Sequence, residues 1–384
     1  MKRLRVGVVV SEFGLPSEIW ALRQAEGFRD FTPVYFAQKQ RADGYGLPQG
    51  RDLHLFGPQP MGIGRRIRRK LGQASGGAPD RPYLRAMRAS LLAADLDVIL
   101  CHFAWNGVAV LKAVGSAVPV VCHAHGRDVT TNLQWAANRR ALSRALPGFA
   151  AVVTVGSHQL ETLKSLWPEA HSHLIPCGVP FAEFSRNPIP ERAGNAPARF
   201  ITVGRLSDEK GVLQTLEAFE GALGAGMEGR LTYIGDGPRR ADLEKAIEAR
   251  GLGDRVELMG RRTPEEIAEH LAASHVYVQH SREAEGWIEG FGVALTEAGA
   301  SGLPLISTRL GGIPDQVEDG KNGLLVAPDD IQGQMAAMLK LAQDEPLRRA
   351  MGAEAREVAR RFDTVAQIAK LEAVLHEAAA RGGM

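Results

Sequence analysis

The sequence is poor in the features that define several large classes of protein. Its 384 residues include only three cysteines, Cys101, Cys122 and Cys177, which excludes a disulfide-built fold and indicates reduced core thiols of a cytosolic protein. No apolar run approaches the roughly 18 residues that a membrane-spanning helix needs. The apolar stretch from Val6 to Val10 is too short for the core of a signal peptide. We therefore expect a globular cytoplasmic protein.

Familiar cofactor and nucleophile signatures are also missing. The first turn, Ser11 to Gly14, lacks the Gly-x-Gly-x-x-Gly of dinucleotide enzymes, and no Ser/His/Asp order with a nucleophile elbow occurs. Asp95-Leu96-Asp97 precedes a buried strand and predicts a turn at a helix end. His123 and His125 share a strand face and offer two metal ligands, but the sequence shows no third. We predict no metal site and no cofactor.

Charge is distributed unevenly along the chain. The net charge is only +2, but residues 1–190 hold 23 basic and 13 acidic side chains and so carry +10, which leaves −8 for the rest. At roughly 100–200 residues per domain, the length predicts two domains. The basic part could face nucleic acid, an anionic membrane or an anionic substrate. Nucleic acid is disfavoured because no basic and aromatic residues interleave.

Short apolar strands alternate with helical segments, which predicts βαβ units and parallel sheets. A buried strand opens the chain at Met1–Val10, a helix follows through about Arg29, and residues 42–64 predict a long loop. Residues 84–94 predict a helix, and residues 331–380 are mostly helical with a break near Phe362. Further strands are predicted at 31–36, 98–102, 118–123, 151–155, 199–203, 230–234, 255–258, 276–279 and 304–307. A Pro-rich stretch at 186–197 predicts a linker between two doubly wound α/β halves, whose ligands bind at the carboxyl ends of the strands.

The most informative motif is Glu289-Gly290-Phe291-Gly292 together with Glu297. The first Glu lies in a loop with two glycines, and the second lies early in an apolar helix over 293–300. Glycines before a helix expose backbone N–H groups where the helix carries partial positive charge, which suits anionic or hydroxyl-rich ligands. A capped helix with a surface Glu explains the segment alone equally well.

A second motif links a strand to a helix from Val203 to Gly211. Arg205 offers a planar fork and Lys210 a mobile point charge, a common pair for a diphosphate. The alternative is a solvated loop with an internal Lys–Asp pair; the spacing is not that of a P-loop. Two glycine turns follow other strands, Gly235-Asp236-Gly237-Pro238 and Gly311-Gly312, and the second allows close approach of the backbone to a ligand.

Together these motifs resemble the retaining, nucleotide-sugar-dependent glycosyltransferases of the GT-B fold, over nearly the whole chain. The order matches: Gly-Arg-Leu-x3-Lys-Gly, Gly-Asp-Gly-Pro, Glu-x7-Glu, Ala298–Pro304 and Gly-Gly-Ile-Pro-Asp. His125-Gly126-Arg127-Asp128 is similar to the family's His-Gly-x-Asp, and Phe13–Glu18 to the entry loop of the exopolysaccharide group. The resemblance implies two Rossmann-like domains facing a central cleft. Residues 1–190, with a returning C-terminal helix at 361–384, would bind the acceptor, and residues 191–360 the donor.

The resemblance also implies roles for the matching residues. Arg205 and Lys210 would bind the donor diphosphate, and Glu297 the ribose hydroxyls. Glu289, with the backbone N–H groups of Gly290, Phe291 and Gly292, would bind the transferred sugar.

Other positions receive roles in the same way. His125 would face the sugar, with Asp128 nearby, and Gly14 would let the first loop approach the diphosphate. Met259 and Arg261 would border the nucleobase. Trp287, Glu283 and Glu285 precede the sugar-binding loop and are candidates for the acceptor side.

The implied reaction moves a hexose from a nucleoside diphosphate sugar, UDP favoured and GDP second, to give an α linkage. Fixed cations stabilise the leaving diphosphate in place of a metal ion. A front-face mechanism, in which the leaving phosphate takes the acceptor proton, fits retention. A covalent role for Glu289 stays open.

The acceptor is expected to be a lipid-linked saccharide or glycolipid at the cytoplasmic face of a membrane. Clustered cations beside apolar residues favour lipid headgroups; they are Arg65, Arg66, Arg68, Arg69 and Lys70. A second basic helix over 132–146 carries Trp135. A solvated arginine-rich face is the alternative for both. Competing functions are a soluble sucrose-, trehalose- or glycogen-type synthase, and a nucleotide-sugar-binding protein without catalysis.

Overall fold

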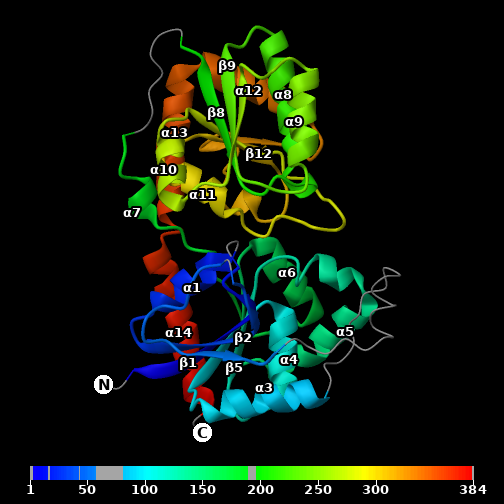
Figure 1. Cartoon of the computed structure of the whole chain (residues 1–384), viewed down its shortest axis with the longest axis vertical. Helices are drawn as coiled ribbons and strands as arrows, with labels where there is room; N and C mark the ends of the chain where they lie inside the picture. The colour runs from blue at the N-terminus through cyan, green and yellow to red at the C-terminus, as the bar shows by residue number, and fades with distance from the viewer. Residues whose placement is uncertain (1–2, 16–17, 43, 58–80, 189–195, 383–384) are drawn as a thin grey trace. The chain divides into compact units, whose positions relative to one another are not determined.

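A computed structural model describes residues 3–15, 18–42, 44–57, 81–188 and 196–382 (Figure 1). The chain forms two compact units. Unit 1 comprises Met1–Gly178 with Val365–Met384, and unit 2 comprises Val179–Thr364. Each unit is built on its own parallel sheet, which confirms the predicted α/β class with two Rossmann-like halves.

The sheet of unit 1 has seven strands among the described residues, in the order β3-β2-β1-β4-β5-β6-β7, all parallel. The order reverses between β1 and β4. Continuous apolar runs such as Val98–His102 form these strands because helices bury both faces of the sheet. The strands are β1 (Leu4–Phe13), β2 (Phe31–Gln40), β3 (Leu53–Leu55), β4 (Val98–His102), β5 (Val120–Ala124), β6 (Ala151–Thr154) and β7 (Ser172–Leu174).

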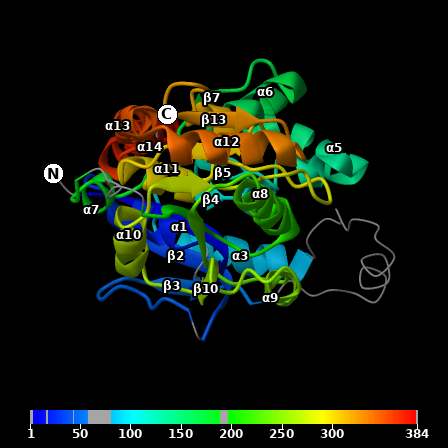
Figure 2. The same cartoon turned by 90° about the horizontal axis from the view of Figure 1, so that it is seen from above.

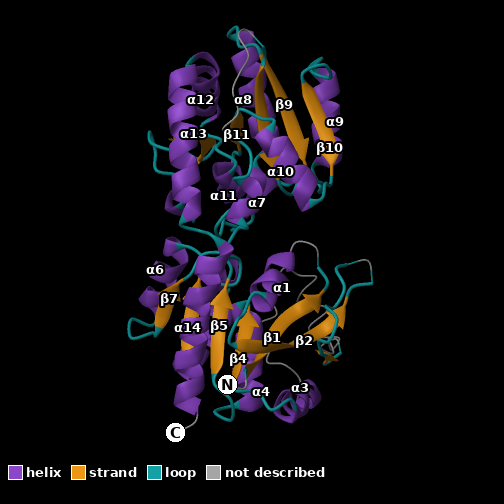
Figure 3. Cartoon of the chain, turned by 90° about the vertical axis from the view of Figure 1, so that its left-hand side faces the viewer, coloured by secondary structure: helices purple, strands orange, loops and turns teal. Residues whose placement is uncertain are grey.

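Helices lie on both faces of this sheet (Figure 3). Two hydrophobic clusters, one on each face, lie between these helices and the strands. One contains residues of α3 (Arg81–Ala93), α4 (Ala104–Val114), α5 (Ala136–Ala145) and α6 (Ser157–Leu166). The other contains residues of α1 (Ile19–Glu26) and of the C-terminal α14 (Thr364–Gly382). Glu372 of α14 accepts hydrogen bonds from the backbone N–H groups of Arg29, at 2.7 Å, and Asp30, at 2.9 Å. The end of the chain is therefore part of unit 1, as the returning helix implies.

The sheet of unit 2 has six strands among the described residues, in the order β10-β9-β8-β11-β12-β13, again parallel. Its order reverses between β8 and β11. The strands are β8 (Ala198–Val203), β9 (Gly229–Ile234), β10 (Val256–Gly260), β11 (Val276–Val278), β12 (Leu305–Thr308) and β13 (Gly323–Val326).

Helices cover both faces of this sheet too (Figure 2). α8 (Val212–Gly224), α9 (Arg240–Ala249) and α12 (Ile331–Gln343) contribute to one cluster. α7 (Phe181–Phe184), α10 (Pro264–Ala272) and α11 (Val293–Ala300) contribute to the other. α13 (Glu345–Arg360) supplies Met351 to the first and Ala359 to the second.

The division between the units lies at Gly178, whereas the sequence predicts residue 190. The physical reason is α7, whose Phe181 and Phe184 are buried in a core of unit 2. The second division lies at Thr364, where the sequence predicts residue 360. The helix break expected near Phe362 separates α13 from α14.

Some local expectations are wrong. The predicted loop over 42–64 contains β3, a three-residue edge strand too short to show a pattern. The edge strand β7 (Ser172–Leu174), also three residues long, is missing from the predicted strands. The turn at Asp95–Asp97 after α3 and the buried, unpaired state of all three cysteines are confirmed.

Three points bear on the expected contact with a membrane. No helix in the described part of the chain is both long and apolar enough to span a bilayer. The basic segment from Arg65 to Lys70 lies outside the described residues. On α5, Arg139, Arg140 and Arg144 are exposed and Trp135 precedes them with 41% of its surface accessible, so the solvated and the lipid-contacting interpretations both fit.

Candidate active site

The carboxyl ends of the unit 2 strands bring together the residues that the sequence places in separate motifs. β8 ends at Val203, directly before Gly204 and Arg205, and β9 ends before the Gly235-Asp236 turn. β11 ends next to Gln279, across the reversal of strand order. Ligands of doubly wound folds bind at such a switch point.

At this edge Lys210 forms an ion pair with Glu289. The Lys210 Nζ atom donates to Glu289 Oε2, and the Glu289 side chain is only 7% exposed. Gln279 Nε2 donates to the same oxygen over 3.2 Å. Tyr277 in turn holds Gln279, because its hydroxyl donates to Gln279 Oε1 over 2.9 Å. The carboxylate is thus held in one place by a cation and an oriented amide.

Trp287 lies beside the Lys210 end of this ion pair. The Lys210 Nζ atom is 5.3 Å from the centre of the indole ring, a cation–π distance. Trp287 therefore belongs with the predicted diphosphate ligand, although the sequence suggests the acceptor side for it. Glu283 and Glu285, its companions in that expectation, are exposed.

The alternative of an internal Lys–Asp pair in the 203–211 loop is wrong. Asp208 pairs with Arg239 over 2.7 Å, which leaves Lys210 to Glu289. Arg205 is exposed at the carboxyl end of β8. The loop thus presents one accessible guanidinium and one partly buried ammonium.

The glycine-rich loop 290–292 leads into α11. Gly292 has φ 87° and stands at the N-cap, and no side chain caps the helix there. The first N–H groups of a helix have no partner within it, so this end can bind hydroxyl or anionic groups. Phe291 is buried against Phe362 with ring centres 5.3 Å apart. Only its backbone is placed for the role that the resemblance implies.

Glu297 lies one turn into α11 and is half-buried. It is close enough to Tyr277 to help raise the pKa of that phenol, together with burial and Glu289. The two acidic residues of the Glu-x7-Glu motif therefore lie near the same tyrosine.

The Gly311-Gly312 turn packs against the Glu289 loop. A Cβ on Gly311, whose φ is +56°, would lie 2.2 Å from the Glu289 carbonyl oxygen, and one on Gly312 would lie 2.2 Å from that of Gly290. The Gly312 N–H donates to Glu289 O over 3.0 Å. The close approach that the sequence predicts toward a ligand is made here to the backbone of the Glu289 loop.

Met259 and Arg261 flank Gly260, the last residue of β10. Met259 is partly buried, whereas Arg261 is exposed, 3.9 Å from Asp236. Both stand at the carboxyl edge of the sheet, on the side of β8 away from Glu289.

In unit 1 the predicted residues also gather at the carboxyl ends of strands. Gly14 follows β1 with φ 91°, and its carbonyl accepts a hydrogen bond from the Tyr45 N–H over 3.2 Å. His125 follows β5, and its Nε2 atom lies 3.0 Å from Nδ1 of His102 at the end of β4. Burial and neighbouring histidines lower the pKa of His125.

Asp128 clamps the loop that carries His125. Its carboxylate oxygens accept hydrogen bonds from the N–H groups of Ala104, at 2.7 Å, His125, at 3.1 Å, and Gly126, at 2.9 Å. Burial raises its pKa, and these N–H groups oppose that rise. Asp128 therefore positions His125 through the backbone.

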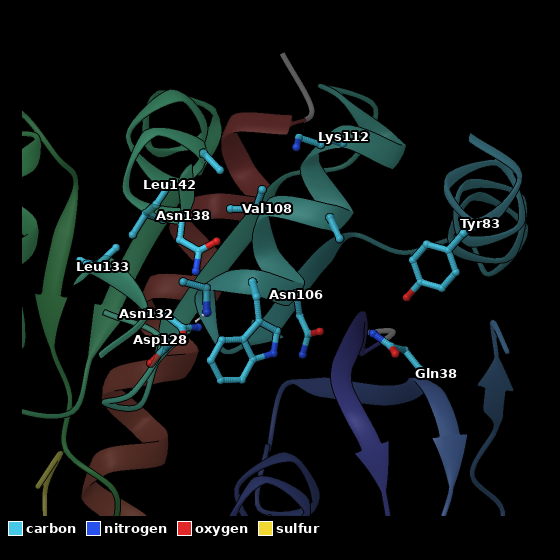
Figure 4. A pocket seen from close by; sticks show the side chains of 14 residues that line it. Gln38, Tyr83, Asn106, Val108, Lys112, Asp128, Asn132, Leu133, Asn138 and Leu142 are labelled. Atoms are coloured by element: carbon cyan, nitrogen blue, oxygen red, sulfur yellow. Dashed lines mark hydrogen bonds between the residues drawn. The ribbon is translucent and has the colours of Figure 1, made fainter. Parts of the chain in front are cut away.

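A pocket lies beside this loop (Figure 4). Its volume is about 160 Å³, which is smaller than the ~300 Å³ of the smallest drug-sized sites. Asn132 and Asn138 line one side, and Tyr83 and Gln38 the other (Figure 4). The adjoining Trp105 is 37% exposed. Carboxamides, a phenol and an indole around a small space suit one hydroxyl-rich ring.

No sequence motif singles out Gln279, His102 or the carboxamides of this pocket. Gln279 and His102 carry the one available signal, a polar residue that ends a buried apolar strand. Asn132 and Asn138 carry none, because they reach the pocket from a 3₁₀ turn (Thr131–Gln134) and from α5.

Comparison with known proteins gives the class. Residues 43–183 match the model of Glycosyltransferase Family 4, and residues 185–358 match that of Glycosyl transferases group 1. With two Rossmann-like sheets, the chain belongs to the glycosyltransferases of the GT-B fold. Within that class it resembles enzymes of exopolysaccharide biosynthesis.

One such relative is WcaL of Escherichia coli strain K12, a glycosyltransferase assigned to colanic acid biosynthesis. The two chains are 30% identical over 265 residues, which is 65% of this chain and 63% of WcaL. The chain thus spans less than two thirds of that relative.

Solved structures share the fold. HepE of Anabaena in complex with UDP aligns with a TM-score of 0.77 and 18% identity, covering 97% of this chain and 99% of HepE. Sucrose-phosphate synthase of Thermosynechococcus elongatus aligns with a TM-score of 0.75 and 19% identity, covering 96% of this chain and 98% of that protein.

Proposed function

We propose that the protein is a retaining glycosyltransferase that moves a hexose from a nucleoside diphosphate sugar to a saccharide carried by a lipid. UDP is the favoured nucleotide and GDP the second. The observation that carries the proposal is the Lys210–Glu289 pair beside Arg205 and the uncapped start of α11. One edge of one sheet thereby offers cations for a diphosphate and hydrogen-bonding groups for a sugar.

Arg205 and Lys210 hold the diphosphate and stabilise the charge that develops on it as the sugar leaves. Fixed cations aimed at a developing charge need no reorganisation during the reaction. No metal ion is required in this account.

Glu289 acts as a ligand of the transferred sugar. Its Oε2 atom already accepts from Lys210 and Gln279, and the side chains of Glu289 and Gln279 are buried. Gln279 still donates to that oxygen when Lys210 turns to the diphosphate. We favour the front-face mechanism, in which Glu289 only binds the sugar hydroxyls, and a covalent intermediate on Glu289 is the alternative. His125 contacts the same sugar, held in place by the Asp128 clamp.

The small pocket of unit 1 takes the terminal sugar of the acceptor. A sugar ring can stack on the exposed Trp105 and bond to the carboxamides, since both kinds of contact suit hydroxyl-rich ligands. In this proposal the lipid part of the acceptor stays in the membrane, and the protein contacts the membrane surface while it acts on the saccharide.

A transfer assay tests the proposal. The full chain is incubated with UDP-hexoses and GDP-hexoses and with lipid-linked saccharides, without added metal, and the anomeric configuration of the product is determined. We expect an α-linked product with one nucleotide. Transfer to a soluble sugar or sugar phosphate in preference to the lipid-linked acceptor would identify a soluble synthase instead. Nucleotide binding without transfer or donor hydrolysis would identify a binding protein.

The acceptor pocket has its own test. Asn138→Ala is expected to raise the KM for the acceptor about tenfold and to leave donor hydrolysis unchanged, because the lost hydrogen bond is worth about 1–1.5 kcal/mol. Gln134→Ala, an exposed side chain in the neighbouring turn, is the control. An unchanged acceptor KM in Asn138→Ala would show that the saccharide does not bind in this pocket.

A further inference from the structure

Three histidines meet at the carboxyl ends of two neighbouring strands in unit 1. His102 ends β4 and His123 lies in β5, and the two are register partners in the parallel pair. Their side chains therefore lie side by side on one face. His125 follows His123 by two residues, which returns its side chain to that face. The sequence shows the pair His123 and His125; only the sheet supplies His102.

The ring nitrogens are near enough to share one ion. One ligand atom of each histidine lies within 4.8 Å of the others. His102 Nδ1 and His125 Nε2 are 3.0 Å apart, and the ring centres of His123 and His125 are 4.3 Å apart. A tetrahedral zinc ion with bonds of 2.0–2.1 Å holds its ligand atoms about 3.4 Å apart. Small side-chain rotations bring the three nitrogens to that spacing.

Most of these nitrogens lack a hydrogen-bond partner among the described residues. His102 Nε2, His125 Nδ1 and both ring nitrogens of His123 are buried in this state. An ion shared by the three rings would give His123 a partner for one of its two buried nitrogens.

The surrounding groups select the kind of ion. Cys101 and Cys122 belong to the hydrophobic cluster on the other face of the sheet, so no thiol joins the set. The Asp128 carboxylate is held by backbone N–H groups. Trp20 and Phe103 wall the cluster, with ring centres 4.1 Å and 5.1 Å from that of His125. Three imidazoles in an apolar wall suit Zn²⁺, Ni²⁺ or Cu²⁺ and not Mg²⁺ or Ca²⁺.

We propose that His102, His123 and His125 form a binding site for one Zn²⁺ ion, and that the bound ion withdraws His125 from the transferred sugar. Zinc is then a reversible inhibitor of transfer. The binding site stands on the three histidines alone, whereas the inhibition rests on the proposed function of His125.

A second group of potential ligands, His171, His173 and Glu377, competes for the assignment. It is more exposed, and Arg381 places a guanidinium nitrogen 2.9 Å from His171 Nε2. A fixed positive charge at that distance opposes a cation. This group supplies the matched control.

The test is metal binding to the full chain after removal of metal with a chelator. Zn²⁺ is titrated by calorimetry, and Co²⁺ by visible absorption. We expect one ion per chain and the spectrum of tetrahedral Co²⁺ with nitrogen ligands and no thiolate band. His102→Gln and His123→Gln are each expected to weaken Zn²⁺ at least tenfold, and His171→Gln to leave it unchanged.

The variants have a check for folding. His102 and His123 are fully buried, so circular dichroism accompanies each titration. If the glutamine variants unfold, His123→Cys keeps a ligand and is expected to add a thiolate band to the Co²⁺ spectrum. Absence of a tight one-to-one site in the unchanged chain, or its loss in His171→Gln, would overturn the site.

Inhibition is measured separately on the transfer reaction, with UDP binding as the reference. We expect Zn²⁺ to abolish transfer and a chelator to restore it, while UDP binding persists. Zinc bound at the histidines with undiminished transfer would overturn the inhibitory role only. Failure of the chain to bind any nucleotide would count against the proposed function and not against the zinc site.

Discussion

Lys210 and Glu289 lie 79 residues apart in the sequence and form one ion pair at the carboxyl edge of the unit 2 sheet. Each is a predicted ligand, one of the donor diphosphate and the other of the transferred sugar. Their pairing means that an incoming diphosphate competes with Glu289 for the ammonium group. The same contact holds both side chains at the site that we propose for the donor.

Substitution of the two partners should therefore have opposite effects on nucleotide binding. Lys210→Ala is expected to weaken UDP binding at least tenfold. It is also expected to lower turnover by about 10²–10³, since it removes a charge that stabilises the leaving group. Glu289→Gln is expected to abolish transfer yet to bind UDP at least as tightly as the unchanged chain, because Lys210 is released. Steady-state kinetics and calorimetry measure the two quantities.

Lys321→Ala is the matched control for these variants. Lys321 pairs with Glu318 over 3.0 Å and precedes β13, at the amino end of the sheet. Its loss should change neither turnover nor UDP binding. Weaker UDP binding in Glu289→Gln than in the unchanged chain would contradict the competition between the carboxylate and the diphosphate.

Gly311 should tolerate no side chain. Gly311→Ala introduces a Cβ 2.2 Å from the Glu289 carbonyl oxygen and must displace the loop that carries Glu289. A shift of that loop by about 1 Å is expected to cost roughly 10²-fold in turnover. Gly320→Ala is the control, because Gly320 also has a positive φ, 79°, but a Cβ there meets no atom of the described residues within 4 Å. It should lose only about 1–2 kcal/mol of stability. Equal turnover of the two variants would show that the close packing of Gly311 against the Glu289 loop is not needed for activity.

Glu18 should make unit 1 less stable as pH rises. Burial, with the charge of Glu12 as a smaller cause, raises the pKa of Glu18 from 4.5 to about 7. The folded chain therefore holds this proton more tightly than the unfolded chain, and stability falls between about pH 4.5 and pH 7. The shift corresponds to about 3 kcal/mol at most.

Glu18→Gln removes this dependence. In denaturant unfolding, the variant should match the unchanged chain at pH 4 and exceed its stability at pH 8. Glu161→Gln, at an exposed position of α6, should show no such difference. A Glu18→Gln variant with the same pH dependence as the unchanged chain would show that the carboxyl group is not held in its protonated form.

The C-terminal helix should contribute to the stability of unit 1 through Glu372. Glu372→Ala leaves the N–H groups of Arg29 and Asp30 without their acceptor and is expected to cost about 1–3 kcal/mol. Glu377→Ala, exposed on the same helix, should cost less than 0.5 kcal/mol, as surface substitutions usually do. Equal unfolding midpoints for Glu372→Ala and Glu377→Ala would show that the Glu372 hydrogen bonds do not stabilise unit 1.

Much of this architecture could be predicted because buried parallel strands have a strong signal. Val98–His102 is a pure apolar run with a polar end, and its predicted bounds agree with β4. β3 and β7, with three residues each at the sheet edges, show no such pattern. The boundary at Gly178 depends on which core takes Phe181, a tertiary contact that a Pro-rich linker does not reveal.

The residues proposed to bind the donor stand in recognisable sequence motifs, but the sequence does not show which of them pair with one another. Lys210 has an adjacent Asp208 in sequence, and only the sheet order shows that Glu289 is its partner while Arg239 takes Asp208. His102 escaped notice for the same reason, since the register of β4 against β5 is what places it beside His123.

The most direct test of the central claim is a calorimetric titration with UDP, GDP and ADP without added metal, on the unchanged chain and on Lys210→Ala. The account predicts saturable binding of one nucleotide, UDP first, that weakens at least tenfold in Lys210→Ala, the loss of one charge-assisted contact. Binding of equal strength in both proteins, or no binding of any nucleotide with or without anionic vesicles, would contradict the assignment of Lys210 to the donor diphosphate.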